Sequence, residues 1–143
     1  MMENGQQLTS RSAIPQNATT VLLIDDSAIQ AATRQAVLRR AGYFVIAALD
    51  PVRVLEQLRH DKFPVPVGAA ITDHVMPGMS GAEFVRELRR THPTLPVMVI
   101  SGEEDAEWEY AGMNVRFLVK PLMPDLLLSN LRELLEQEQV GVA

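Results

Sequence analysis

Apolar positions divide the chain into short continuous runs that alternate with amphipathic segments. From Thr20 onward, five such runs are apolar at successive positions rather than at every second one. The runs are Val21–Asp25, Tyr43–Ala48, Val67–Asp73, Pro96–Ile100 and Val115–Val119. Continuous apolar runs of this length are typical of strands buried on both faces of a parallel sheet. The pattern therefore predicts five central strands.

The segments after the first two runs carry the end signals of helices. One helix is predicted from about Ser27 to Arg40, where Gly42 is placed to stop it. A second is predicted to have Asp50 as its N-cap and Pro51 as its first residue. Each strand is thus followed at once by a helix, as in a repeated βα unit.

The later segments continue this alternation, with one weak member. Ser80–Glu83 has the pattern of a capping box and opens a third helix. Pro124–Asp125 opens a fifth, whose leucines recur at helical spacing. Between them, Glu103–Met113 leaves room for barely two turns. We therefore expect a short or distorted fourth helix.

Five βα units predict an α/β fold with a three-layer, doubly wound, five-stranded parallel sheet. The polar residues 1–19 lack periodicity and are predicted to be a flexible N-terminal tail. The domain is predicted to span 20–138, with 139–143 as a C-terminal tail. So little chain after the fifth helix leaves no room for an output domain, and we expect either a stand-alone domain or a fragment of a longer protein.

Composition excludes several classes of function. The net charge of −5 and the lack of a Lys/Arg block argue against direct nucleic-acid binding. The absence of cysteine excludes disulfides and thiolate chemistry. No apolar run is long enough to span a membrane, and the N-terminus has no secretory signal, so a cytoplasmic location is expected.

Three aspartates end two of the predicted strands. Asp25 and Asp26 follow the first apolar run, and Asp73 ends the third. Adjacent carboxylates repel one another unless a cation holds them together. A cluster of carboxylate oxygens suits Mg²⁺, and a carboxylate can attack a phosphoryl group as a nucleophile. The alternatives are that Asp26–Ser27 only caps the first helix, and that Asp73 only turns the chain.

A hydroxyl and a cation follow two further strands, the fourth and the fifth. Ser101 could cap the next helix or donate to a phosphoryl oxygen, and Lys120 could be solvated or reach toward Asp73 as a point charge. Whether the Lys120–Pro121 bond is cis is left open. His74 lies next to Asp73, but we expect its side chain to point elsewhere.

Four motifs follow one another along the chain: the acidic pair, Asp-x-x-Met-Pro-Gly-Met-x-Gly, the Ser–Gly strand end and Lys–Pro. In this order they resemble the receiver domain of two-component response regulators, and the resemblance covers about Thr20 to Glu136. The resemblance implies a flavodoxin-like sheet of order 2-1-3-4-5 and a phosphoacceptor at Asp73. It implies Mg²⁺ held by Asp25, Asp26, Asp73 and the backbone carbonyl of Val75. It also implies that Ser101 and Lys120 contact the phosphoryl group, with Ser101 and Phe117 acting as the switch.

The implied function is a signalling module rather than an enzyme with its own substrate, although it would catalyse its own phosphorylation and dephosphorylation. A sensor histidine kinase or a phosphotransfer protein would donate the phosphoryl group. An unknown downstream protein, or a second copy of the chain in a homodimer formed on phosphorylation, would read it. The alternative is a pseudo-receiver, which binds partners without phosphorylation.

The segment from Ser101 to Lys120 is shorter than the family pattern, and this is the one departure from the resemblance. Trp108 and Tyr110 lie in it. We interpret them as aromatic residues that fill a gap in the core, with partner contact as the alternative.

Two enzyme classes fit the sequence less well. An Asp-x-Asp phosphatase would need its second aspartate at position 27, where Ser27 stands, and no Gly-x-Gly-x-x-Gly follows the first strand as in a Rossmann domain.

Overall fold

A computed structural model describes residues 18–60 and 62–142. Five parallel strands form one sheet in the order β2-β1-β3-β4-β5. The strands are β1 (Thr20–Ile24), β2 (Phe44–Ala48), β3 (Ala69–Asp73), β4 (Val97–Ser101) and β5 (Arg116–Val119). The predicted fold and strand order are confirmed, and each observed strand lies within two residues of its predicted start.

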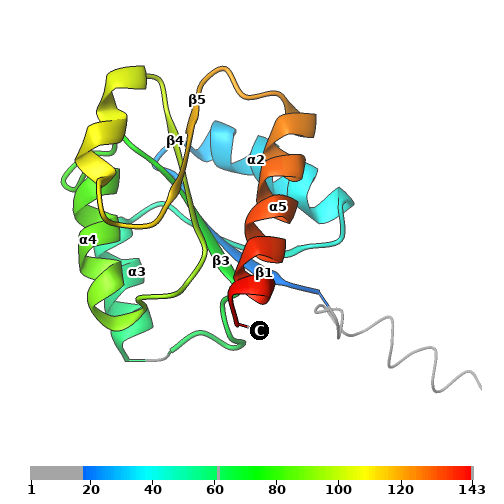
Figure 1. Cartoon of the computed structure of the whole chain (residues 1–143), viewed down its shortest axis with the longest axis horizontal. Helices are drawn as coiled ribbons and strands as arrows, with labels where there is room; N and C mark the ends of the chain where they lie inside the picture. Colours follow the sequence, from blue (N-terminus) through cyan, green and yellow to red (C-terminus); the bar gives the residue numbers. More distant parts are fainter. Residues whose placement is uncertain (1–17, 61, 143) are drawn as a thin grey trace, which may run out of the picture.

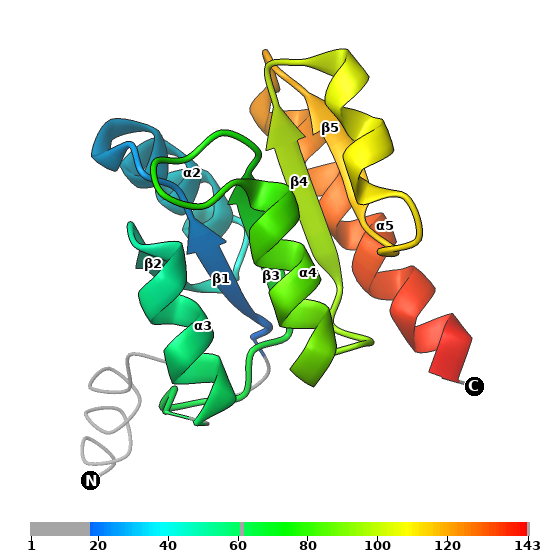
Figure 2. The ribbon, with the colours of Figure 1, turned by 90° about the vertical axis from the view of Figure 1, so that its left-hand side faces the viewer.

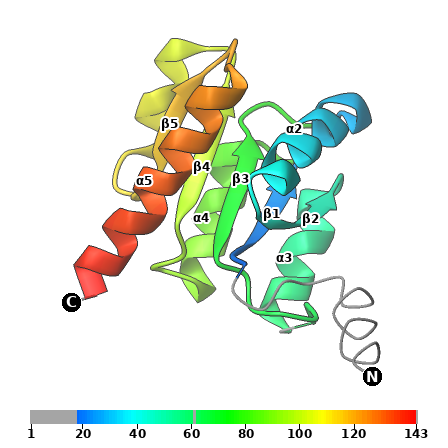
Figure 3. The same cartoon turned by 90° about the vertical axis from the view of Figure 1, so that its right-hand side faces the viewer.

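Helices cover both faces of this sheet, which gives the three predicted layers (Figure 1). They are α2 (Ala28–Arg40), α3 (Pro51–Arg59), α4 (Gly81–Thr91), the 3₁₀ helix η1 (Glu104–Tyr110) and α5 (Pro124–Val142). Helices α3 and α4 lie on one face (Figure 2), and α2 and α5 lie on the other (Figure 3). None of the helices in the described part of the chain is long and apolar enough to cross a bilayer.

Only part of the predicted division into a domain and two tails lies within the described residues. The N-terminal tail predicted for 1–19 lies outside them, except for Ala18 and Thr19. At the other end, α5 continues to Val142, beyond the predicted limit of 138. The division into a domain and two tails stays a prediction.

Local signals set the helix starts where the sequence predicted them. The Ser27 hydroxyl accepts from the Gln30 N–H at 3.3 Å, and the Asp50 carboxylate accepts from the Val52 N–H at 3.0 Å. At the start of α4, Ser80 and Glu83 each accept from the other's backbone N–H, which completes the predicted capping box. These caps satisfy N–H groups that the helices leave unpaired.

The apolar core consists of two clusters, one on each face of the sheet. The first packs side chains of α3, α4 and η1, including Val54, Phe84, Leu88 and Tyr110, against strand residues such as Leu22 and Val99. The second packs α2 and α5 against the other face through Ala31, Leu38, Leu127 and Leu131. Side chains alternate between the two clusters along each strand, which explains the continuous apolar runs in the sequence.

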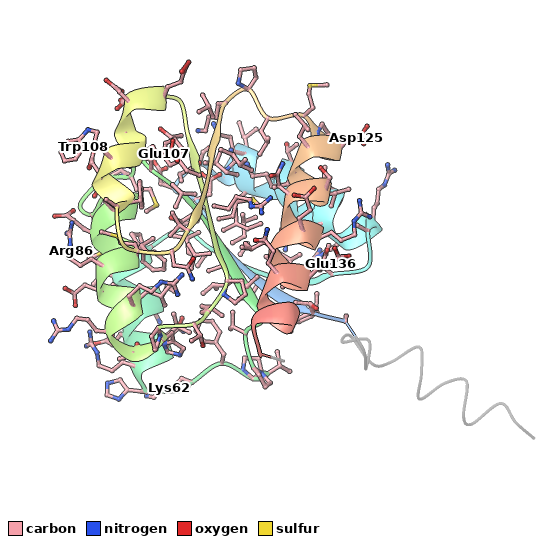
Figure 4. The ribbon with its side chains drawn as sticks, viewed as in Figure 1. Lys62, Arg86, Glu107, Trp108, Asp125 and Glu136 are labelled. Carbon is pink, nitrogen blue, oxygen red and sulfur yellow. The ribbon has the colours of Figure 1, made fainter. Side chains whose placement is uncertain are left out.

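The segment between β4 and β5 is abbreviated, as predicted. Here η1 spans Glu104–Tyr110 in place of a longer helix. Tyr110 is buried in the first core cluster, so it fills the core as expected. Trp108 is 75% exposed and projects outward from η1 (Figure 4), so the core-filling interpretation is wrong for this residue.

Candidate functional site

Three carboxylates meet at the carboxyl ends of the central strands. Asp25 follows β1 and Asp73 ends β3, and these strands are neighbours in the sheet. One oxygen from each of Asp25, Asp26 and Asp73 lies within 4.8 Å of the other two. The strand order reverses between β1 and β3, and α/β sheets place ligand sites at such a point. The structure thus brings together the side chains predicted for one site.

The donors at this site fit a magnesium ion. All three are carboxylate oxygens, which Mg²⁺ prefers. Asp25 is fully buried and Asp73 almost so, whereas Asp26 is exposed and open to solvent. Burial first, and then the neighbouring Asp73 carboxyl, raise the pKa of Asp25 to about 6. A raised pKa means that the ionised form of Asp25 is costly without a nearby cation.

A positively charged side chain of the protein itself contacts this carboxylate cluster. Nη1 of Arg34, on α2, donates to Asp25 Oδ2 at 2.8 Å and to Asp73 Oδ1 at 3.0 Å. Arg34 is not among the site residues predicted from the sequence. Its signal is its spacing, since Arg34 follows the buried Ala31 by three positions and precedes the buried Leu38 by four. A basic residue within the core-facing stripe of the helix after an acidic pair indicates a charge partner inside the site.

The predicted lysine is close to Asp73. The backbone N–H of Lys120 donates to the Ser101 carbonyl at 2.7 Å, which places Lys120 just beyond the end of β5. Its Nζ lies 3.4 Å from Asp73 Oδ1 and 3.4 Å from Gln30 Oε1. The Lys120–Pro121 bond is cis. A second positive charge therefore faces the Asp73 carboxylate.

The predicted hydroxyl has a structural partner in this conformation. Ser101 ends β4, and its Oγ accepts from the Glu103 N–H at 2.8 Å and donates to the Glu103 carbonyl at 3.0 Å. Asp73 pairs with Ile100, so Ser101 lies one position further along the adjacent strand. The hydroxyl is therefore in the right part of the sheet but is engaged with the turn that precedes η1.

A buried polar contact lies next to Asp73 in the chain. His74 Nδ1 and the Tyr110 hydroxyl are 2.7 Å apart, and His74 Nε2 lies 3.5 Å from Glu109 Oε2. Burial, followed by the charge of Glu109, raises the pKa of Tyr110, so the phenol keeps its proton. The His74 side chain contacts Tyr110 and Glu109 of η1, so it points away from Asp73 as expected.

The two remaining predicted residues occupy different surroundings. Val75 is 65% exposed in the loop after β3. Phe117, on β5, is half-buried, and its ring centroid lies 5.7 Å from that of Tyr110. Tyr110 therefore contacts both His74, next to Asp73, and the aromatic residue predicted to act as a switch.

Comparison with known proteins gives a consistent result. A family model described as the response regulator receiver domain matches residues 21–140. Among curated proteins, the chain is 33% identical over 124 residues to the hydrogenase transcriptional regulatory protein HoxA of Cupriavidus necator. It is 37% identical over 122 residues to the C4-dicarboxylate transport transcriptional regulatory protein DctD of Pseudomonas aeruginosa. These matches cover 83% and 82% of the chain, but only 24% and 25% of the two relatives.

Solved structures agree with this match. The chemotaxis protein CheY4 of Vibrio cholerae aligns with a TM-score of 0.73 and 27% identity, and the alignment covers 82% of this chain and 98% of that one. A receiver domain protein of Methanospirillum hungatei aligns with a TM-score of 0.78 at 19% identity, over 87% of this chain and 99% of that one. The second likeness concerns the fold alone.

Proposed function

Because the chain belongs to the response regulator receiver family, we propose that it accepts a phosphoryl group on Asp73 and thereby switches a protein-interaction surface. The observation that carries this proposal is the convergence of charge on one oxygen. Asp73 Oδ1 lies 3.4 Å from the Lys120 ammonium, within a cluster of three carboxylates. A carboxylate placed in this way can act as a nucleophile toward phosphorus while a fixed cation faces the incoming group.

Asp25, Asp26 and Asp73 would hold Mg²⁺, together with the backbone carbonyl of Val75. Bound there, Mg²⁺ would screen the charge between two approaching anions and stabilise the phosphoryl oxygens. The donor set supports this assignment, since all three side chains offer carboxylate oxygens.

The donor in the proposed reaction is a phosphohistidine of a sensor kinase or of a phosphotransfer protein. An oxygen of Asp73 forms a bond to phosphorus while the phosphorus–nitrogen bond breaks, and the electron pair of that bond stays on the imidazole. The Lys120 ammonium faces the charge that collects on the phosphoryl oxygens. The product is an aspartyl phosphate that carries roughly −1.5 to −2 charges where the carboxylate carried one.

The added charge would draw in the hydroxyl at the end of the next strand. Ser101 would exchange its two hydrogen bonds with Glu103 for one to a phosphoryl oxygen. Releasing Glu103 would loosen the turn before η1, and Phe117 would follow through its contact with Tyr110. The phosphoryl group would thus favour one of two arrangements of the β4–η1–β5 region.

A direct test uses a small acyl phosphate as donor. The protein incubated with the donor and Mg²⁺ should gain the mass of one phosphoryl group, in an adduct stable to acid and labile to base. Asp73→Asn should gain none, because an amide cannot form the acyl phosphate. Equal uptake by the wild type and Asp73→Asn would refute the assignment, and no uptake by the wild type would favour a receiver that acts without phosphorylation.

A further inference from the structure

We infer that Arg34 is a built-in counter-ion that competes with divalent cations for the carboxylates of Asp25 and Asp73. In this view Arg34 neutralises Asp25 and Asp73 while no metal is bound, and it must withdraw before Mg²⁺ can reach the same oxygens. The inference deepens the proposed function, because it concerns the same site, but it is tested by metal binding rather than by phosphorylation.

The contacts of Arg34 are directed at two of the three aspartates that would hold a metal. A single nitrogen, Nη1, lies 2.8 Å from Asp25 Oδ2 and 3.0 Å from Asp73 Oδ1. It therefore bridges the two buried carboxylates of the cluster that would hold the metal. The other oxygen of Asp25 accepts the Ser27 N–H at 2.9 Å, so both oxygens of this carboxylate already have donors.

A magnesium ion and this guanidinium exclude one another on physical grounds. Mg²⁺ requires its oxygen ligands at about 2.0–2.1 Å in near-octahedral geometry. A guanidinium has donors only, so it cannot serve as a ligand, and its positive charge repels a nearby dication. Since both cations use Asp25 and Asp73, occupation by one weakens occupation by the other.

The burial of Arg34 makes this competition significant. The Arg34 side chain is 14% exposed and the Asp25 side chain is completely buried, so water screens their attraction only weakly. Arg34 is anchored on α2 between buried residues of the core stripe, whereas exposed arginines of the same helix, such as Arg40, lie in its last turn. Its remaining exposure leaves the guanidinium a path toward solvent when a stronger cation enters.

Two consequences follow for the protein. The affinity for Mg²⁺ is lower than the three carboxylates alone would give, because part of the binding energy is spent on displacing Arg34. The fold also depends less on metal, because the carboxylates remain paired when the metal is absent.

The test measures Mg²⁺ affinity by calorimetric or NMR titration of the full chain. Arg34→Met and Arg34→Gln should bind Mg²⁺ at least about tenfold more tightly than the wild type, since a charge-assisted hydrogen bond no longer competes. The matched control is Arg40→Met, which removes the same charge from the same helix. It should change the affinity by no more than about twofold, as expected for an exposed charge screened by salt.

Thermal unfolding gives a second readout. In EDTA the two Arg34 variants should melt below the wild type, because their carboxylates lose the internal cation, and Mg²⁺ should raise their melting temperature more than it raises that of the wild type. If both variants fail to fold, the wild type still permits a test. The guanidinium NMR signal of Arg34 should shift as Mg²⁺ saturates the site.

Several results would overturn the inference. Two concern affinity: the wild type and the Arg34 variants bind Mg²⁺ equally tightly, or Arg40→Met gains as much Mg²⁺ affinity as the Arg34 variants. The other two are that none of these proteins binds Mg²⁺, or that the guanidinium NMR signal of Arg34 does not shift when Mg²⁺ is added. Failure of the proposed function is distinguishable. Tighter Mg²⁺ binding in the Arg34 variants without any adduct on Asp73 would refute phosphoacceptance and leave the competition standing.

Discussion

Replacement of Gly81 by alanine should destabilise the protein through a contact with the backbone of Asp73. Gly81 is the first residue of α4, and its N–H donates to the His74 carbonyl at 2.7 Å. An added Cβ would lie 2.5 Å from the Asp73 carbonyl oxygen and 2.6 Å from the Tyr110 hydroxyl. Both distances are far shorter than any ordinary carbon–oxygen contact.

The magnitude follows from how far these neighbours must move. To reach an ordinary contact of 3.4 Å, the Asp73 carbonyl would have to move away by about 0.9 Å. That carbonyl belongs to a central strand and also accepts the Thr72 hydroxyl at 3.0 Å, so it cannot move freely. Overpacking of this kind costs about 1–3 kcal/mol, and the better helix propensity of alanine returns at most about 1 kcal/mol. Because the added Cβ meets two groups at once, the cost lies in the upper half of that range, and we expect a net loss of about 1–2 kcal/mol.

Urea unfolding followed by circular dichroism measures this loss. The matched control is Gly102→Ala, since a Cβ at Gly102 meets nothing within 4 Å and the backbone there has no positive φ. Gly102→Ala should leave the free energy of unfolding unchanged or raise it by up to about 1 kcal/mol. A Gly81→Ala protein as stable as Gly102→Ala would refute the close approach of α4, β3 and η1 on which the reasoning depends.

Three further predictions address the groups around Asp73. Tyr110→Phe leaves the buried His74 Nδ1 without its partner at 2.7 Å. It should lower the free energy of unfolding, measured by urea denaturation, by about 1–3 kcal/mol. A loss below about 0.5 kcal/mol would contradict this. Burial raises the pKa of Asp25 from 3.8 to about 6, so the folded protein keeps a proton that the unfolded chain releases as the pH rises from 4 to 6. The free energy of unfolding therefore falls across that pH window because of this carboxyl. Metal-free Asp25→Asn should lose less stability between pH 4 and 6.5 than the wild type does. An equal or larger loss would argue against a raised pKa of Asp25. Lys120→Met removes the ammonium 3.4 Å from Asp73 Oδ1 and should slow phosphoryl uptake from a small donor by about tenfold or more. An unchanged rate in a quenched time course would exclude a role for Lys120 in the transfer.

The fold could be predicted because its signals are local. Apolar runs buried on both faces identify parallel strands, and caps such as Ser27, Asp50 and Ser80 mark helix starts through bonds within the next three residues. The short connection before β5 was equally visible, since its length is a property of the sequence.

The site could be predicted only as far as strand ends determine it. Asp25 and Asp73 converge because their strands are neighbours, which topology alone implies. The bridge from Arg34 depends on the path of a long side chain across a helix face, and periodicity gives only its starting point. Ser101 shows the same limit, since the partner of its hydroxyl is set by the turn at Glu103 and not by the strand that carries it.

The contrast between Trp108 and Tyr110 has a similar cause. Both aromatic residues lie in η1, two positions apart, and the sequence offered the same interpretation for each. In a 3₁₀ helix with three residues per turn, positions two apart face different directions. Tyr110 therefore enters the core beside Phe117, while Trp108 points to solvent.

The central claim is that Asp73 itself receives the phosphoryl group, and chemical mapping tests it most directly. The protein treated with an acyl phosphate and Mg²⁺ is reduced with borohydride, which converts an aspartyl phosphate to homoserine, and is then digested and sequenced by mass spectrometry. We expect homoserine at position 73 and unmodified aspartate at positions 25 and 26. Two results would contradict the claim. One is homoserine at position 25 or 26, and the other is the absence of homoserine from all three positions in a protein that carries phosphate at another residue.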